Sequence, residues 1–141
     1  VAFVGIVRPM PGLDAGRYLE GECNFIHSKH LYSDFLAQRS DDWGGSNVHV
    51  CEYDMECEEG LSWSDWVEGG YGGSFASGDY EYQGETISIV LNLDKGTMTV
   101  FGPRTVRKGG LSGPYCWYAS VLGVSSDAAS IKRLASLPDV V

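Results

Sequence analysis

Acidic residues at alternate positions of one predicted strand are the first groups in this sequence that could do chemistry. The segment 48–58 alternates as a strand does, and one of its faces carries Glu52, Asp54, Glu56 and Glu58. Side chains two apart on a strand lie about 6.6 Å from each other on the same face. Like charges at that spacing need water, a cation or basic side chains to screen them. The pattern predicts a solvated outer face; docking of a Lys/Arg-rich partner and a calcium site are the alternatives.

Histidines and cysteines are the other residues that could bind a metal or take part in catalysis, but their spacing does not favour a metal or catalytic site. His27 and His30 could share a helix face but lack a third ligand, and His49 beside Cys51 is typical of a buried histidine near a thiol. No Cys-x-x-Cys occurs, which predicts reduced thiols rather than a zinc ribbon. The motifs of serine hydrolases, phosphate-binding loops and zinc proteases are absent from the sequence. We therefore predict no metal, no cofactor and no enzymatic activity.

Aromatic residues gather in a glycine-rich connection predicted for 60–75. Trp63 and Trp66 are three apart, so one helical turn would place them side by side, and Tyr71 stands in a run of glycines. They could close the core of the fold, or anchor a protein partner, since Trp and Tyr dominate interface hot spots. Stacking on sugar rings is a further alternative. The basic cluster in 101–112 predicts a solvated loop tip, with a docking loop as its alternative; it consists of Arg104, Arg107 and Lys108.

The elements that must position these residues are mainly strands, and the clearest is a hairpin at 86–101. Two alternating apolar runs, one with Ile87, Ile89, Leu91 and Leu93 and one with Met98 and Val100, flank a short link. That link is Asp94-Lys95-Gly96, and Asp and Gly are the residues that tight turns favour.

The other elements follow from the same patterns. Strands are predicted at 1–7, at 115–122 with Trp117, Ala119 and Val121 on one face, and at 18–26. Prolines and glycines predict loops at 8–16 and 41–46. Helical spacing predicts short helices at 28–39 and within 124–141.

The hairpin also carries a family resemblance. Gly78-Asp79, Gly84-Glu-Thr-Ile87 and Leu91-Asn-Leu-Asp-Lys-Gly-Thr-Met-Thr-Val-Phe101 resemble the most characteristic part of the SPRY domain family. Val4-Gly-Ile-Val-Arg8, Asp42-Trp-Gly44 and the closing segment 113–123 add to the likeness. The resemblance implies an all-β, SPRY-like antiparallel β-sandwich with short peripheral helices over 1–123. It also implies that the usual leading strand is missing, and it leaves 124–141 as a C-terminal helical extension.

In that family the loops at one end of the sandwich bind a protein partner. The resemblance places Arg8, Pro9, Pro11, Trp43 and Leu122 among such loops, and Leu122 stands where one branch of the family has tryptophan. With Trp63, Trp66 and Tyr71, these are the candidate partner-binding residues.

The net charge of the chain restricts the classes of molecule that it can bind. The chain has 141 residues and a net charge of −9, with 19 acidic against 10 basic residues. Nucleic acid and anionic membrane surfaces would be repelled, and a partner with a basic surface is favoured. No apolar run approaches the roughly 20 residues of a membrane helix. The irregular cysteines and the lack of a visible signal peptide favour an intracellular protein, or an organellar one if the chain is processed. We expect a protein–protein interaction module; a structural subunit of a large assembly and a glycan-binding domain are the alternatives.

Overall fold

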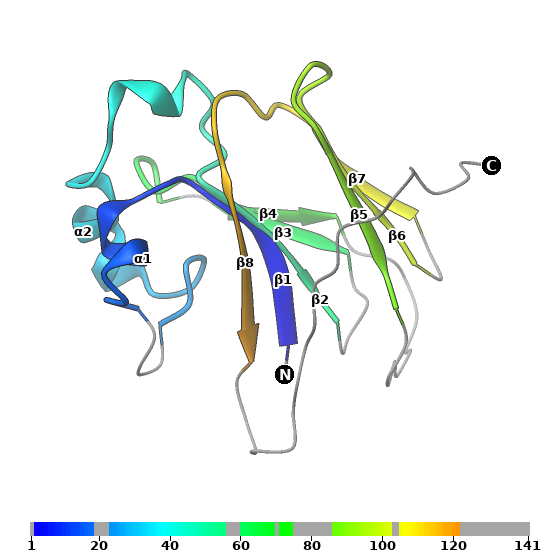
Figure 1. Ribbon diagram of the computed structural model, residues 1–141, viewed down its shortest axis with the longest axis horizontal. Coiled ribbons are helices and arrows are strands. Elements are labelled where there is room, and N and C mark those ends of the chain that lie inside the picture. Colours follow the sequence, from blue (N-terminus) through cyan, green and yellow to red (C-terminus); the bar gives the residue numbers. More distant parts are fainter. Residues whose placement is uncertain are drawn as a thin grey trace.

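Two antiparallel sheets form the body of the protein (Figure 1). The computed structural model describes residues 2–18, 23–55, 60–69, 71–74, 86–102 and 105–121. The larger sheet has the strand order β4-β3-β2-β1-β8 and consists of β1 (Ala2–Val7), β2 (Val50–Asp54), β3 (Leu61–Ser64), β4 (Tyr71–Ser74) and β8 (Cys116–Val121). The smaller sheet has the order β5-β6-β7 and consists of β5 (Ser88–Asn92), β6 (Thr97–Phe101) and β7 (Thr105–Lys108). The prediction of an all-β sandwich is confirmed.

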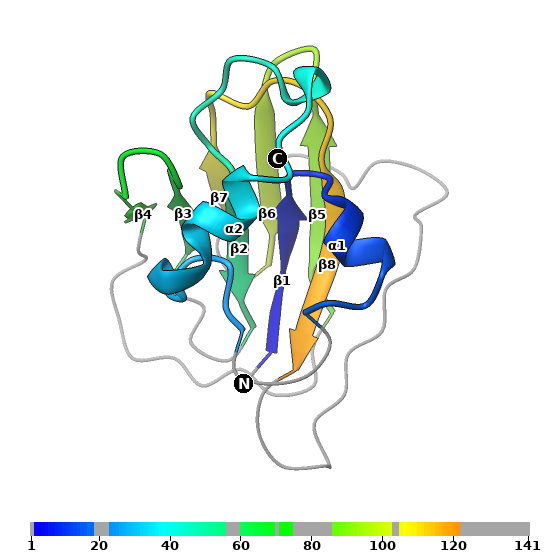
Figure 2. The ribbon, with the colours of Figure 1, turned by 90° about the vertical axis from the view of Figure 1, so that its left-hand side faces the viewer.

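Each face of the larger sheet is covered by a different layer, so the protein has two cores. The smaller sheet packs on one face, and short helices pack on the other (Figure 2). These helices are α1 (Pro11–Asp14), η1 (Lys29–Leu31), α2 (Tyr32–Leu36) and η2 (Asp41–Trp43). Alternation along β1 and β2 divides their side chains between the cores: Ile6 and Cys51 point to the smaller sheet, while Val7 and Val50 point to the helices.

The predicted hairpin is present as β5 and β6. Ser88 pairs with Phe101, and Asn92 pairs with Thr97. The Asn92 side chain accepts a hydrogen bond from the Lys95 backbone N–H (3.1 Å), and Gly96 supplies the positive φ of 66° that closes the turn. One detail of the prediction is wrong: Leu93 does not line the inner face but is 45% exposed, because it lies past the end of β5, in the turn.

Several segments predicted as loops form strands or a helix instead. The connection predicted for 60–75 contains β3 and β4, and the predicted loop tip at 101–112 contains β7. All three are short strands that gain their hydrogen bonds from a neighbour, as β7 does from β6. The predicted loop at 8–16 contains α1, because Pro11 occupies the first helical position, where its missing N–H costs nothing.

On strand β8, the face that carries Trp117 and Ala119 is the exposed one. Trp117 is 48% exposed, whereas Cys116 and Tyr118 pack against the helix-side core. The smaller sheet is offset toward β3 and β4, which β7 contacts, and β8 is an edge strand of the larger sheet. The predicted helix at 28–39 is confirmed as η1 and α2, and the predicted strand at 18–26 is not formed at its described residues, 18 and 23–26. The predicted helix within 124–141 lies outside the described residues.

Candidate functional site

Loops from distant parts of the chain meet at one end of the sandwich, the upper end in Figure 1. This loop end consists of 8–10, 43–47, 93–96 and 109–115. Ser46 Oγ donates to the Gly110 carbonyl (2.6 Å), and the Leu111 N–H donates to the Gly96 carbonyl (3.0 Å). The Trp43 indole N–H donates to the Pro9 carbonyl (2.8 Å). Each loop is therefore bonded to another loop of the same end.

Arg8 is the internal cross-link of the loop end. Its Nη1 donates to the carbonyls of Ser112 (2.6 Å) and Pro114 (3.1 Å), and its Nη2 donates to the carbonyl of Ser46 (3.3 Å). The guanidinium carbon lies 4.1 Å from the centre of the Tyr115 ring. Burial lowers the pKa of this completely buried side chain, and Nε has no hydrogen-bond partner in the described part of the chain. Arg8 therefore holds loops together, and its side chain is not exposed.

Trp43, Trp66 and His49 fill the core just below these loops. The His49 ring stacks on Trp66, with ring centres 5.2 Å apart and an interplanar angle of 10°. His49 Nδ1 accepts a hydrogen bond from the Trp66 backbone N–H (3.0 Å), so this nitrogen carries no proton. Burial lowers the pKa of His49 from 6.5 to about 4, although Asp65 Oδ1 lies 3.6 Å away and acts in the other direction. His49 is therefore neutral at pH 7, and the contact with Asp65 is not an ion pair.

The candidate partner-binding residues do not form one surface. Arg8, Trp43 and Trp66 are buried, so their side chains are not available to a partner in this structure. Pro9 is half-buried, and Pro11 is exposed on α1. At the loop end, the exposed charged side chains include Asp94 and Lys95 on the β5–β6 turn, and Asp41 and Asp42 on the adjoining η2.

The remaining candidates lie elsewhere. Trp63 faces the smaller sheet, where Lys108 Nζ lies 4.5 Å from its ring centre, while Trp66 belongs to the opposite core, so the two do not form a common platform for a sugar. Tyr71 belongs to β4, and Leu122 lies outside the described residues. Val121, just before Leu122, pairs with Ala2 at the far end of β1 from Arg8.

The predicted acidic face is not a solvated surface at Glu52. This residue is only 3% exposed, because the helical layer covers that face of β2, and its carboxylate accepts a hydrogen bond from the Tyr118 hydroxyl. Burial raises the pKa of Glu52 above its ordinary value, against the lowering effect of hydrogen bonds from Tyr118 and Asn24. Asp54 is half-buried, and Glu56 and Glu58 lie outside the described residues.

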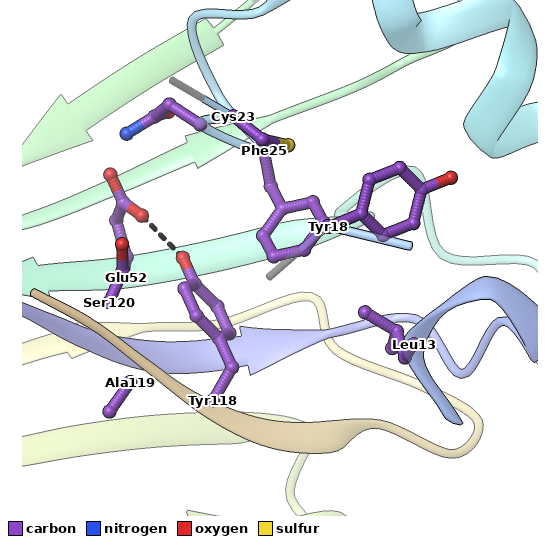
Figure 3. Close-up of a pocket in the computed structure, with 9 residues that line it drawn as sticks. Leu13, Tyr18, Cys23, Phe25, Glu52, Tyr118, Ala119 and Ser120 are labelled. Carbon is purple, nitrogen blue, oxygen red and sulfur yellow. Dashed lines mark hydrogen bonds between the residues drawn. The ribbon is translucent and has the colours of Figure 1, made fainter. Parts of the chain in front are cut away.

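Glu52 lies beside a cavity of about 140 Å³ between the larger sheet and the helical layer (Figure 3). The carboxyl and the Tyr118 hydroxyl point toward each other at one side, and the aromatic rings of Tyr18 and Phe25 lie at the other. Sequence patterns do not predict this pocket, because its walls come from distant parts of the chain: α1, Tyr18, the segment 23–25, β2 and β8. The residues that line it are Leu13, Tyr18, Cys23, Asn24, Phe25, Glu52, Tyr118, Ala119 and Ser120.

The thiols of the described residues are poor nucleophiles. Cys23, Cys51 and Cys116 are free, as the sequence predicts. Burial raises the pKa of Cys51 to about 12 and also raises the pKa values of Cys23 and Cys116, whereas a catalytic cysteine needs a lowered pKa. Within the described ranges, no three His, Cys, Asp or Glu side chains gather as metal ligands would, and no helix is long and apolar enough to cross a membrane.

Comparison of the chain with protein-family models, with curated proteins and with solved structures finds no match.

Proposed function

We propose that this chain is a non-catalytic protein-interaction module, related to the SPRY family, that binds a protein partner through the loop end. The observation that carries the proposal is the cross-link made by Arg8, whose guanidinium bonds to carbonyls of two separate loops, at Ser46 and at 112–114. Loops held in place before binding lose less conformational entropy when a partner docks, so a fixed loop end on a rigid sandwich suits recognition.

The two-sheet architecture and the β5–β6 hairpin support the SPRY part of the proposal, because the hairpin lies at the residues that resemble the family motif. The charge supports a basic partner. The chain carries a net charge of −9, and Asp41, Asp42 and Asp94 are exposed on or beside the loop end. Complementary charge mainly speeds association and selects among partners.

A charge-reversal experiment tests this proposal. The double variant Asp41→Lys/Asp42→Lys is compared with Asp14→Lys/Glu68→Lys, which makes the same change in net charge at exposed positions on α1 and in the β3–β4 turn. The immobilised chain captures partners from an extract of its source. We expect basic proteins that elute with salt, that the control variant retains and that the loop-end variant loses. Equal capture by both variants, or no salt-sensitive capture, would contradict the proposal.

Strand β8 favours a second candidate, the structural subunit of a larger assembly. Among the described strands β8 pairs only with β1, and it carries Trp117, which is 48% exposed. An exposed strand edge can take a strand from another chain. Under this alternative Trp117→Ser would release the chain from its native complex in sedimentation, while Asp41→Lys/Asp42→Lys would not.

A further inference from the structure

The cavity beside Glu52 has walls of three kinds. A carboxylate and a tyrosine hydroxyl lie at one side, aromatic rings lie at the other, and the small residues Ala119 and Ser120 of β8 line the cavity on the carboxylate side (Figure 3). A volume of about 140 Å³ admits a ligand of several non-hydrogen atoms, since one water in the liquid takes about 30 Å³.

The carboxylate at the cavity has neutral hydrogen-bond partners. Tyr118 donates its hydroxyl to one oxygen of Glu52. The side-chain oxygen of Asn24 accepts the backbone N–H groups of Ile26 (2.8 Å) and His27 (2.9 Å), which leaves its amide NH₂ to bond Glu52. No basic group of the described residues forms an ion pair with Glu52 or acts on its pKa. A buried carboxylate is costly without a cation, so this side of the cavity favours a positively charged ligand.

The aromatic side of the cavity is held in place by packing and hydrogen bonds. The rings of Phe25 and Tyr118 lie 5.2 Å apart edge to face, and those of Tyr18 and Phe25 lie 5.8 Å apart edge to face. The Tyr18 hydroxyl points away from the cavity, toward Asp34 Oδ2 (2.7 Å) and Gln38 Nε2 (2.6 Å). Tyr18 thus offers only its ring, and aromatic rings attract cations and pack against alkyl chains.

We propose that this cavity binds a primary ammonium group carried on a short alkyl chain, with the ammonium donating to Glu52 and the chain lying against Tyr18 and Phe25. The ligand is either a free alkylamine or the side chain of a lysine, because both present the same group. The proposal does not depend on the loop end. The loop end follows the last residue of β1, whereas residues 119–121 pair with the first residues of β1.

Other cations fit this cavity less well. A guanidinium prefers to bond both carboxylate oxygens at once, but one oxygen of Glu52 already accepts Tyr118. A calcium ion needs six to eight oxygen ligands, and no group of three His, Cys, Asp or Glu side chains forms in the described part of the protein. An ammonium needs one carboxylate oxygen and can use the Ser120 hydroxyl, which lines the cavity.

Glu52 is the titratable group of the cavity whose ionisation should control binding. Burial raises the pKa values of the other titratable groups that line the cavity, so these groups stay neutral at pH 7; they are Tyr18 of the segment after α1, Cys23 and Tyr118 of β8. Asp54 is the neighbouring carboxylate on β2 itself. Since burial raises the pKa of Glu52, the affinity for an ammonium should increase with pH until Glu52 is fully ionised.

The test is a titration of the full chain with n-butylammonium chloride at constant ionic strength, followed by NMR shifts of the Phe25 and Tyr118 rings. The neutral analogue 1-butanol has the same number of non-hydrogen atoms. We expect saturable shifts with butylammonium, at least tenfold weaker binding of 1-butanol, and affinity that increases with pH. Equal binding of the two probes, or no binding of butylammonium, overturns the proposal.

Two variants locate the site. Glu52→Gln keeps the shape of the side chain. It should weaken the binding of butylammonium at least tenfold and abolish the pH dependence of that binding. Asp54→Asn makes the same change of charge two residues along the same face but outside the cavity lining. It should keep the affinity for butylammonium where Glu52 is ionised and move the pH profile to lower pH, because the Asp54 charge raises the pKa of Glu52. If Glu52→Gln does not fold, Tyr118→Phe serves instead: it removes a hydrogen bond that favours ionised Glu52, so the pH profile should move to higher pH. An equal loss of affinity in Asp54→Asn, or an unmoved profile in Tyr118→Phe, overturns the assignment of the site to Glu52.

One further probe, lysine with its α-amino and α-carboxyl groups blocked, distinguishes the two sources of the ammonium group. Saturable binding of blocked lysine, sensitive to Glu52→Gln, supports a polypeptide lysine as the ligand. Binding of butylammonium without blocked lysine supports a free alkylamine. Either result sustains the ammonium site, and the absence of both contradicts it.

Discussion

The loop end and the cavity each bury one ionisable side chain, but they surround it in different ways. Arg8 is completely enclosed, and its partners are backbone carbonyls and the ring of Tyr115. Glu52 is also buried, but its partners are a hydroxyl and an amide, and a cavity opens beside it. A charge whose acceptors the fold itself supplies belongs to the structure. A charge that faces open space and has neutral partners is where a ligand can add the missing interaction.

Removal of the Arg8 guanidinium should have the largest effect. Arg8→Met keeps an unbranched apolar chain but removes the donor to the carbonyls of Ser46, Ser112 and Pro114, which should lower the free energy of unfolding by about 4 kcal/mol. The control is Arg17→Met, which removes an exposed cation paired with Asp34 (2.7 Å) and should cost less than about 1 kcal/mol. Urea denaturation measures both. Similar losses would show that Arg8 is not a structural charge.

Acid should weaken the core below the loop end through His49. Burial lowers the pKa of His49 to about 4 in the folded protein. As pH falls, the unfolded chain therefore binds a proton at His49 near pH 6.5, whereas the folded protein binds it only near pH 4. Stability from this group is complete above pH 6.5 and decreases as pH falls toward 4, by about 3 kcal/mol in all. The variant His49→Asn keeps an acceptor for the Trp66 N–H but does not titrate. Its stability should depend less steeply on pH over this interval, and an unchanged slope in urea denaturation would refute the assignment.

Close packing of the loops is tested by two glycines with the same backbone conformation. Gly113 (φ 80°) and Gly110 (φ 76°) both have positive φ, but a Cβ on Gly113 would lie 2.3 Å from the Trp43 carbonyl oxygen, whereas one on Gly110 would meet nothing within 4 Å. Gly110→Ala should cost about 1 kcal/mol from backbone strain alone, and Gly113→Ala about 2 kcal/mol more. Thermal unfolding of the two variants gives the difference directly. Equal losses would mean that the loops are not tightly apposed.

The sequence predicts the fold where local patterns decide it. The hairpin of β5 and β6 follows from alternation and from Asn92, Asp94 and Gly96, all within one short segment. The strands β4 and β7 were missed because Gly72, Gly73 and the basic residues near 107 are typical of loops, and their strand character comes from pairing with β3 and β6.

The two buried charges were missed for a related reason. Alternation correctly separates Glu52 from Cys51 and Tyr53, but it does not say that a layer of helices covers the Glu52 face. Arg8 follows a strand as many exposed arginines do, and its acceptors at Ser46 and Ser112 lie 38 and 104 residues away. One signal was available: Phe25, Tyr32 and Phe35 lie close together in the sequence and apart from the predicted hairpin, and they build the second core.

Replacing Glu52 by a neutral side chain should have the smallest effect on stability. It should increase stability, whereas the changes at Arg8, His49 and the glycines decrease it or remove its pH dependence. Because burial raises its pKa above the ordinary 4.5, the cost of ionising Glu52 is absent below that pH and appears as pH increases through the pKa of the folded protein. Glu52→Gln should therefore be more stable than the natural chain at pH 7, by about 1 kcal/mol, and the advantage should vanish in acid. Asp54→Asn is the comparison: it removes a like charge that raises the pKa of Glu52 but keeps the buried carboxyl, so its gain should be smaller. Urea denaturation from pH 4 to 8 is the measurement. A loss of stability at pH 7 would mean that Glu52, like Arg8, is a charge that the fold itself requires, and the contrast between the two regions would fail.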